Sequence, residues 1–251
     1  IKSVNRPSIF AKNISSFLDE VNIATDGTFK AAPASGGIVN SLNQLRLVNY
    51  NFNSGTEGTY NSSDNCSWGK NSFSNGECTN WGNPFSELVL ECYRYLAGKT
   101  PDGAFDADDT GYLPGLTRQT TWSNPQTTAT ACANLNVIGI NASTISYDRD
   151  QLGKITDLAT TKTAQQLTKS VGDGENITGK YFFVGENGGS GVGDNSQTCT
   201  AKLVSDLGLV EGTCPDAPRL DGSYRLAGMA HQAHIADIRP DITDKQAVST
   251  Y

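Results

Sequence analysis

The acidic stretch DADDTGY at residues 106–112 has the residue types and spacing of a calcium-binding loop. Calcium prefers oxygen ligands, and loops of this type place them at alternate positions around a glycine turn. The matching positions are Asp106, Asp108, Thr110 and Tyr112, with Gly111 at the turn. The closing glutamate is absent, because Thr117 stands in its place, and Asp102 could supply the missing carboxylate. Calcium is therefore a candidate cofactor, and a solvated acidic loop is the alternative.

A second group of carboxylates, Asp148 and Asp150, flanks Arg149 shortly after an apolar run at 133–140. Loops at the carboxyl ends of strands line the ligand crevice of an open α/β sheet, so the pair could bind a cation. The alternative is a turn in which the two carboxylates cap the backbone and pair with Arg149.

Signatures of catalysis are weak elsewhere. No serine stands in a Gly-x-Ser-x-Gly motif, and the glycine-rich stretch 185–194 lacks the Lys-Ser/Thr of a phosphate-binding loop. His231 and His234 are spaced to share a metal, but their neighbours favour packed, hydrogen-bonded histidines. We therefore expect a protein that is not an enzyme.

The cysteines predict disulfides. Six are present, at Cys66, Cys78, Cys92, Cys132, Cys199 and Cys214. Their wide spacing without a Cys-x-x-Cys pair favours an oxidising compartment over zinc binding. We expect the short closures Cys66–Cys78 and Cys199–Cys214, and also Cys92–Cys132. The alternative for Cys92 is a free buried thiol on an apolar helix face.

The element that organises these groups is a helix expected over 81–99. Its apolar stripe consists of Phe85, Leu88, Val89, Cys92, Tyr93 and Leu96. Asn83 suits the N-cap, Pro84 the first helical position, and Gly98 a left-handed C-terminal cap.

Further elements alternate along the chain. Helices are expected at 8–22, 154–169 and 223–238, and a helix or helix-like turn at 201–209; strands are expected at 45–52, 133–140 and 180–184. Long polar stretches at 53–80 and 100–130 are expected to be loop insertions. Strands alternating with helices predict an α/β domain with a mostly parallel sheet.

Composition limits the partners. The net charge of -7 argues against a nucleic-acid or anionic-membrane surface. No apolar run reaches the roughly 18 residues that a membrane span needs. Only 18% of the residues are charged and 26 are glycine, which is typical of a loop-rich extracellular protein.

Three segments resemble the PilC/PilY family of type IV pilus assembly and tip-adhesin proteins. They are NWGNPFSELVLECYRYLAGK at 80–99, ISYDRDQLGK at 145–154, and the run from CTAK at 199 through ADIRPD to VSTY at 251. The resemblance implies a von Willebrand factor A-like domain over 1–251, incomplete at both ends and without the family's C-terminal propeller. It also implies a bacterial protein secreted to the pilus tip or outer cell surface.

The metal-ion-dependent adhesion site of such domains is incomplete in this chain. Its Asp-x-Ser-x-Ser motif is absent and Asn83 stands near the expected threonine. After the strand the family usually has Ser-Asp-Ile-Asn, whereas this chain has Gly139-Ile140-Asn141 and lacks the aspartate. The resemblance places Asn83, Asn141, Asp148 and Asp150 in loops at that end of the fold.

The resemblance therefore implies an extracellular, non-enzymatic module for pilus assembly, adhesion and twitching motility. Its expected partners are minor pilins, the pilus tip, and host or abiotic surfaces. The alternatives are a structural subunit of an extracellular filament and a secreted hydrolase that uses Asp148 and Asp150.

Overall fold

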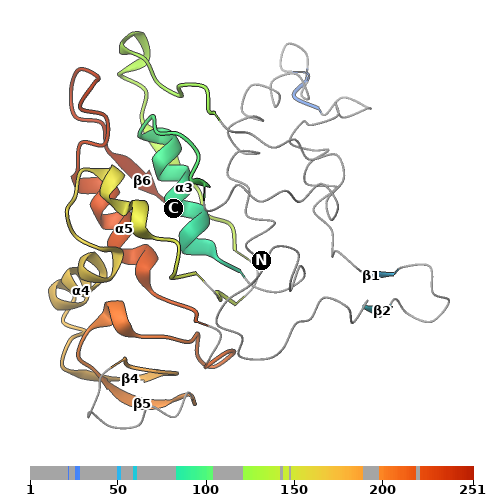
Figure 1. Ribbon diagram of the computed structural model, residues 1–251, viewed down its shortest axis with the longest axis vertical. Helices are drawn as coiled ribbons and strands as arrows, with labels where there is room; N and C mark the ends of the chain where they lie inside the picture. The colour runs from blue at the N-terminus through green and yellow to red at the C-terminus, as the bar shows by residue number, and fades with distance from the viewer. Residues whose placement is uncertain are drawn as a thin grey trace. The chain divides into compact units, whose positions relative to one another are not determined.

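The structure is a computed structural model of the 251-residue chain (Figure 1). It describes residues 22, 26–28, 50–51, 59–60, 83–103, 121–141, 144–146, 148–188, 198–218 and 221–251. The chain divides into two compact units, one comprising 1–67, 72–81 and 100–123, the other 68–71, 82–99 and 124–251. This division does not test the prediction of one domain, since two compact units can belong to one domain.

The described part of the first unit contains the antiparallel pair β1 (Tyr50–Asn51) and β2 (Thr59–Tyr60). The second unit contains helices α3 (Phe85–Leu96), α4 (Ala164–Gly174) and α5 (Arg225–Ile235), with short 3₁₀ helices η3 (Thr128–Thr130), η4 (Gly153–Leu158) and η5 (Leu207–Leu209). Its strands are β3 (Leu135–Val137), β4 (Lys180–Val184), β5 (Thr200–Val204) and β6 (Val248–Thr250).

The strands of the second unit form two small sheets. β3 and β6 are parallel, and Leu135 lies opposite Val248. Backbone hydrogen bonds continue this ladder from Tyr251 to Val137 and from Gly139 to Tyr251. β4 and β5 are antiparallel. The described residues therefore combine helices and sheets as an α/β chain does, whereas a larger parallel sheet of von Willebrand factor A type stays a prediction.

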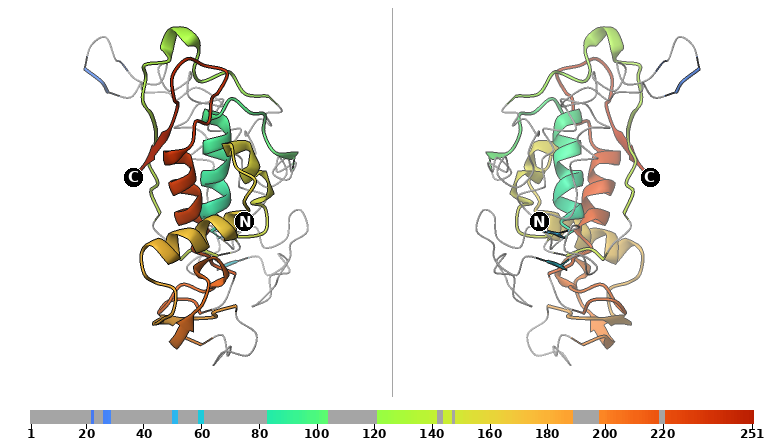
Figure 2. Two further views of the ribbon diagram at one scale, coloured as in Figure 1. Left: turned by 90° about the vertical axis from the view of Figure 1, so that its left-hand side faces the viewer. Right: turned by 90° about the vertical axis from the view of Figure 1, so that its right-hand side faces the viewer.

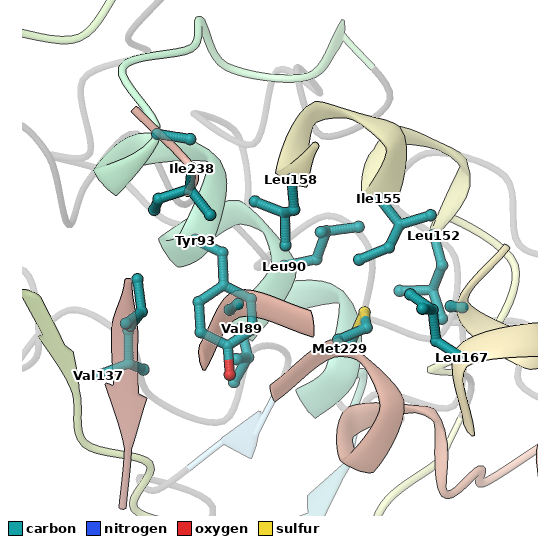
Figure 3. Close-up of a cluster of buried hydrophobic side chains, with 14 of the residues drawn as sticks. Val89, Leu90, Tyr93, Val137, Leu152, Ile155, Leu158, Leu167, Met229 and Ile238 are labelled. Atoms are coloured by element: carbon teal, nitrogen blue, oxygen red, sulfur yellow. The ribbon is translucent and has the colours of Figure 1, made fainter. Parts of the chain in front are cut away.

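Helix α3 lies at the centre of the hydrophobic core of the second unit. Val89, Leu90 and Tyr93 are buried on it, and α5 contributes Met229 and Ala233. Figure 2 shows α3 and α5 side by side, and Figure 3 shows the α3 side chains between those of η4 and that of Val137 on β3. The Tyr93 hydroxyl shares a 2.7 Å hydrogen bond with Thr250 Oγ1, which joins α3 to β6.

The apolar stripe predicted for α3 was partly wrong. Leu88 is 37% exposed, whereas Leu90 is buried. The reason is that α3 is covered on a second side by η4, toward which Leu90 points (Figure 3). The cap at Gly98 is confirmed, since its φ of 69° is left-handed. The N-cap is Pro84 rather than Asn83, and no side chain caps the helix.

Two other predicted helices were partly wrong. The stretch 154–169 is divided, because Ala159 adopts the left-handed conformation after η4 and Thr163 caps a new helix, α4. In the stretch 201–209 the residues up to Val204 belong to β5, since pairing with β4 overrides their local helical preference, and the helical turn η5 follows at Leu207–Leu209. By contrast, α5 and β4 lie within their predicted ranges. The predicted helix at 8–22 and most of the strand at 45–52 lie outside the described residues.

The described parts of the predicted insertion at 100–130 include η3. The insertion at 53–80 lies outside the described residues except for β2. A second, smaller hydrophobic cluster supports the β4–β5 hairpin and consists of Val184, Val204 and Val210. A disulfide between Cys199 and Cys214 closes the segment that contains β5, and it confirms that predicted pair.

Candidate functional site

The start of α3 is joined to two distant loops through Asn83. The Asn83 side-chain amide donates a 2.7 Å hydrogen bond to Asn141 Oδ1, just beyond β3. The Asn83 backbone exchanges hydrogen bonds with the backbone of Ser146, at 3.1 and 3.2 Å. The structure therefore brings together Asn83 and Asn141, two of the four loop residues singled out in the sequence.

Asp148 lies next to this junction but points inward. It has no exposed surface, and its Oδ2 accepts a 2.6 Å hydrogen bond from the hydroxyl of Ser86 on α3. Its Oδ1 accepts a 2.8 Å bond from the backbone amide of Ser223. Burial raises the pKa of this carboxyl group to about 6, although the serine hydrogen bonds lower it in part. Asp148 therefore acts as a buried hydrogen-bond acceptor shared by three segments.

Asp150 lies in a different environment from Asp148. Its side chain is exposed, so the two carboxylates do not form one surface pair. Arg149 is not their partner either: it forms ion pairs with Glu211 and, at 2.8 Å, with Asp221. In the alternative turn, Arg149 was expected to pair with its two neighbours, and that part was wrong, because its guanidinium group pairs with Glu211 and Asp221 instead.

Further polar contacts join α3 to the segment that follows Asp148. Glu87 is buried, and its Oε1 accepts a 3.1 Å hydrogen bond from the backbone amide of Gln151. Two turns later Arg94 pairs with Glu91 and, at 2.8 Å, with Asp157. Segment 148–157 therefore covers a polar face of α3. Buried charges need such partners, since an unpaired ion in a protein interior is strongly unfavourable.

The hydrogen-bonding residues Ser86, Ser146 and Ser223 were not predicted as part of any site. Ser86 lies 62 residues and Ser223 lies 75 residues from Asp148. Serine is abundant in this chain, and no local periodicity distinguishes these three residues. Only the fold identifies them.

The predicted disulfide between Cys92 and Cys132 and the predicted packing of the two histidines both differ from the structure. Cys92 and Cys132 are free, so the predicted pair between them was wrong. Cys92 packs against the main core, whereas Cys132 is exposed. His231 and His234 are exposed on α5 rather than packed.

Several predicted site residues lie outside the described part of the chain. They are Asp106, Asp108, Thr110, Tyr112, Cys66 and Cys78. Among the residues that the structure does describe, no three His, Cys, Asp or Glu side chains cluster as metal ligands. No helix in that described part is long and apolar enough to cross a membrane.

The arrangement around Asn83 and Asp148 thus supplies hydrogen bonds that hold loops against α3. Its amide and hydroxyl groups bond to one another, and its most perturbed carboxyl group is inaccessible. Such a junction can fix the shape of a surface formed by these loops.

Comparison with known proteins gives a consistent match. A family model described as the second domain of PilY1 homologues matches residues 9–233. The type IV pilus biogenesis factor PilY1 homolog of Xylella fastidiosa (strain Temecula1) is 25% identical to this chain over 251 residues. The alignment covers 88% of this chain and 16% of that relative, so the chain spans a small part of the relative's length. No solved structure matches.

Proposed function

This chain belongs to the PilY1-type family of type IV pilus proteins, and we propose that it acts as a non-enzymatic binding and assembly module of a pilus-associated protein. The observation that carries this proposal is the family match over residues 9–233, which includes most of the described second unit. The relative's printed name, a type IV pilus biogenesis factor, supports the pilus role.

The geometry favours binding over catalysis in this proposal. The carboxylate that a hydrolase would need, Asp148, is buried beneath the surface and engaged by Ser86 and Ser223. A general acid or base must reach its substrate within hydrogen-bonding distance. A loop junction of this kind suits a preformed protein-binding surface, because ordered loops lose less conformational entropy on binding.

The finer features of the proposal come from the resemblance to the family. They are a von Willebrand factor A-like architecture, an extracellular position at the pilus tip, and minor pilins or surfaces as partners. The parallel β3–β6 pair, with helices α4 and α5 between the two strands in the chain, supports the architecture. Calcium bound by the loop at 106–112 belongs to the same proposal.

Deletion within the parent gene tests the pilus role. Residues 83–251 are replaced by a flexible linker in the source bacterium, and surface pili are counted by electron microscopy. We expect pili to be lost or strongly reduced while immunoblots show an unchanged amount of the secreted parent protein. Normal pili and normal surface attachment at an unchanged protein level would refute the role.

Biochemistry with the purified chain separates the alternatives. Immobilised chain should retain minor pilins from a detergent extract of sheared pili. Ordered filaments formed by the isolated chain would instead favour a structural subunit. Hydrolytic activity that disappears when Asp148 and Asp150 are both changed to alanine would favour the secreted hydrolase.

A further inference from the structure

Two adjoining hollows, of about 600 and about 290 Å³, lie between η4, α4 and α5 in the second unit and share the lining residues Thr156, Thr161 and Lys162. We call the two hollows together the groove. The larger hollow extends to His231 and Ile235 on α5, and the smaller one extends to Arg225. These volumes are in the range of roughly 300–1,000 Å³ that is typical of ligand sites.

The walls of the groove are fixed by hydrogen bonds. The buried amide of Gln232 donates to the carbonyl oxygens of Leu158 at 2.9 Å and Ala159 at 3.4 Å. At the start of α4, Thr163, which lines the smaller hollow, forms a capping box with Gln166, with bonds of 2.9 and 3.2 Å. Binding of a ligand to this preformed surface would therefore cost little conformational entropy.

The lining combines hydroxyl groups with aliphatic side chains such as Leu167 and Ile235. Hydroxyl groups come from Thr156, Thr160, Thr161 and Ser170, and the described lining contains no Phe, Tyr or Trp. Pockets for small molecules are usually lined by apolar and aromatic side chains. The absence of aromatic side chains from the described lining favours an extended segment of another protein. The hydroxyl groups can bond to both the carbonyl and the amide groups of its backbone.

The smaller hollow carries positive charge on a chain whose net charge is -7. Lys162 forms no ion pair within the described residues, and neither does Arg225, whose hydrogen bonds go to the carbonyl oxygens of Arg149 at 2.8 Å and Gly208 at 3.4 Å. Burial and the nearby charge of Arg149 lower the pKa of Arg225, whereas the charges of Asp148 and Asp206 raise it in part. Asp150 is the one carboxylate in the described lining.

We propose that this groove binds an extended acidic peptide segment of a partner protein. A carboxylate of that segment pairs with Lys162 and Arg225, since clustered cations recognise acidic motifs through charge-assisted hydrogen bonds. The segment then continues past Thr161 toward α5. This inference does not depend on the pilus role proposed above, because it uses only the shape and charge of the groove.

Fluorescence anisotropy with defined peptides tests the inference. The probe is a fluorescein-labelled Gly/Ser decapeptide that carries three consecutive aspartates, and the matched peptide carries asparagines instead. We expect the full chain to bind the aspartate peptide at low ionic strength and to bind the asparagine peptide at least about tenfold more weakly. Equal binding of the two peptides, or no binding of the aspartate peptide, would overturn the proposal.

Charge reversal locates the binding. Lys162→Glu should weaken binding about tenfold or more, whereas Lys245→Glu should change it less than about twofold. Both lysines are exposed and both variants change the net charge equally, but Lys245 lies outside the lining. Thr161→Asp, at the point shared by the two hollows, should also weaken binding. Equal weakening by Lys162→Glu and Lys245→Glu would show a nonspecific charge effect and refute the groove.

Discussion

The hydroxyl group of Ser86 donates a 2.6 Å hydrogen bond to Asp148, and both side chains are fully shielded from solvent. The second carboxylate oxygen accepts the backbone amide of Ser223, so the start of α3, the loop after Ser146 and the segment before α5 meet at one carboxyl group. Because burial opposes the charge on this group, its protonation should affect the stability of the second unit.

Stability should depend on pH through Asp148. Its pKa is about 6 in the folded chain and close to the ordinary 3.8 when unfolded, so the native state binds the proton more tightly. Protonated Asp148 therefore stabilises the folded chain fully below the unfolded pKa of 3.8. This contribution to the free energy of unfolding is lost as the pH rises through the folded pKa of about 6. The difference between the two pKa values corresponds to about 3 kcal/mol of unfolding free energy. Urea unfolding from pH 3.5 to 8 measures it.

The variant Asp148→Asn isolates this contribution. Asparagine can still accept from Ser223 and donate to Ser86, but it has no charge, so the difference in unfolding free energy between variant and wild type should vary with pH. Asp150→Asn, at an exposed neighbour, is the matched control and should leave the pH profile nearly unchanged. A profile for Asp148→Asn that parallels the wild type would contradict the prediction.

Gly228 lets α5 approach α4 closely. A Cβ atom at this position would lie 2.3 Å from the Thr168 backbone nitrogen and 2.5 Å from its Oγ1. The backbone of α4 cannot move aside easily, so Gly228→Ala should destabilise the chain by about 1–3 kcal/mol in urea unfolding. Gly174→Ala is the control, since a Cβ atom there meets nothing within 4 Å. It should be neutral or slightly stabilising, and equal losses in both variants would exclude the steric explanation.

Local signals in the sequence predicted elements well where they were strong. The aromatic run at 180–184 became β4, and Gly98 adopted the left-handed conformation expected at the end of a helix. The residue types of a short strand or of a glycine cap determine the conformation of a few neighbouring residues. Where several such residues occur together, contacts with distant segments seldom change that conformation.

Contacts between distant segments could not be predicted in the same way. The face of α3 that carries Glu87, Glu91 and Arg94 has the pattern of a solvated surface, yet segment 148–157 covers it. Likewise, Asn83 suits an N-cap by residue type, but its side chain bonds to Asn141 instead. The decisive partners are far away in the sequence, and a single sequence carries no signal for them.

Removing the Cys199–Cys214 disulfide should destabilise the hairpin of β4 and β5. The cysteines are 15 residues apart, and opening a loop of this length costs about 3 kcal/mol in the chain-entropy model. Cys199→Ser should therefore lower the urea midpoint, whereas Cys132→Ser, at an exposed free thiol, should not. The effect of Cys199→Ser should disappear when both proteins are measured under reducing conditions. A difference that persists after reduction would point to lost packing instead.

The two free thiols should differ in reactivity. Cys132 is exposed, whereas Cys92 packs against the core, and burial, with a smaller effect of Glu91, raises the pKa of Cys92 to about 12. Only the thiolate reacts with iodoacetamide. Peptide mass spectrometry of the native chain should find Cys132 modified within minutes and Cys92 modified only after unfolding. Protection of both until a reductant is added would instead indicate the disulfide between them.

Calcium uptake tests the acidic loop at 106–112. If its alternating oxygen ligands bind the ion, calorimetry should detect calcium binding in the submillimolar to millimolar range that is typical of extracellular sites. Asp108→Asn removes one charged ligand and should weaken binding about tenfold, because affinity follows the number of charged ligands. Asp216→Asn removes the same charge from an exposed residue elsewhere and should have no effect. Absence of uptake at millimolar calcium, or equal weakening by the two variants, would refute a site in this loop.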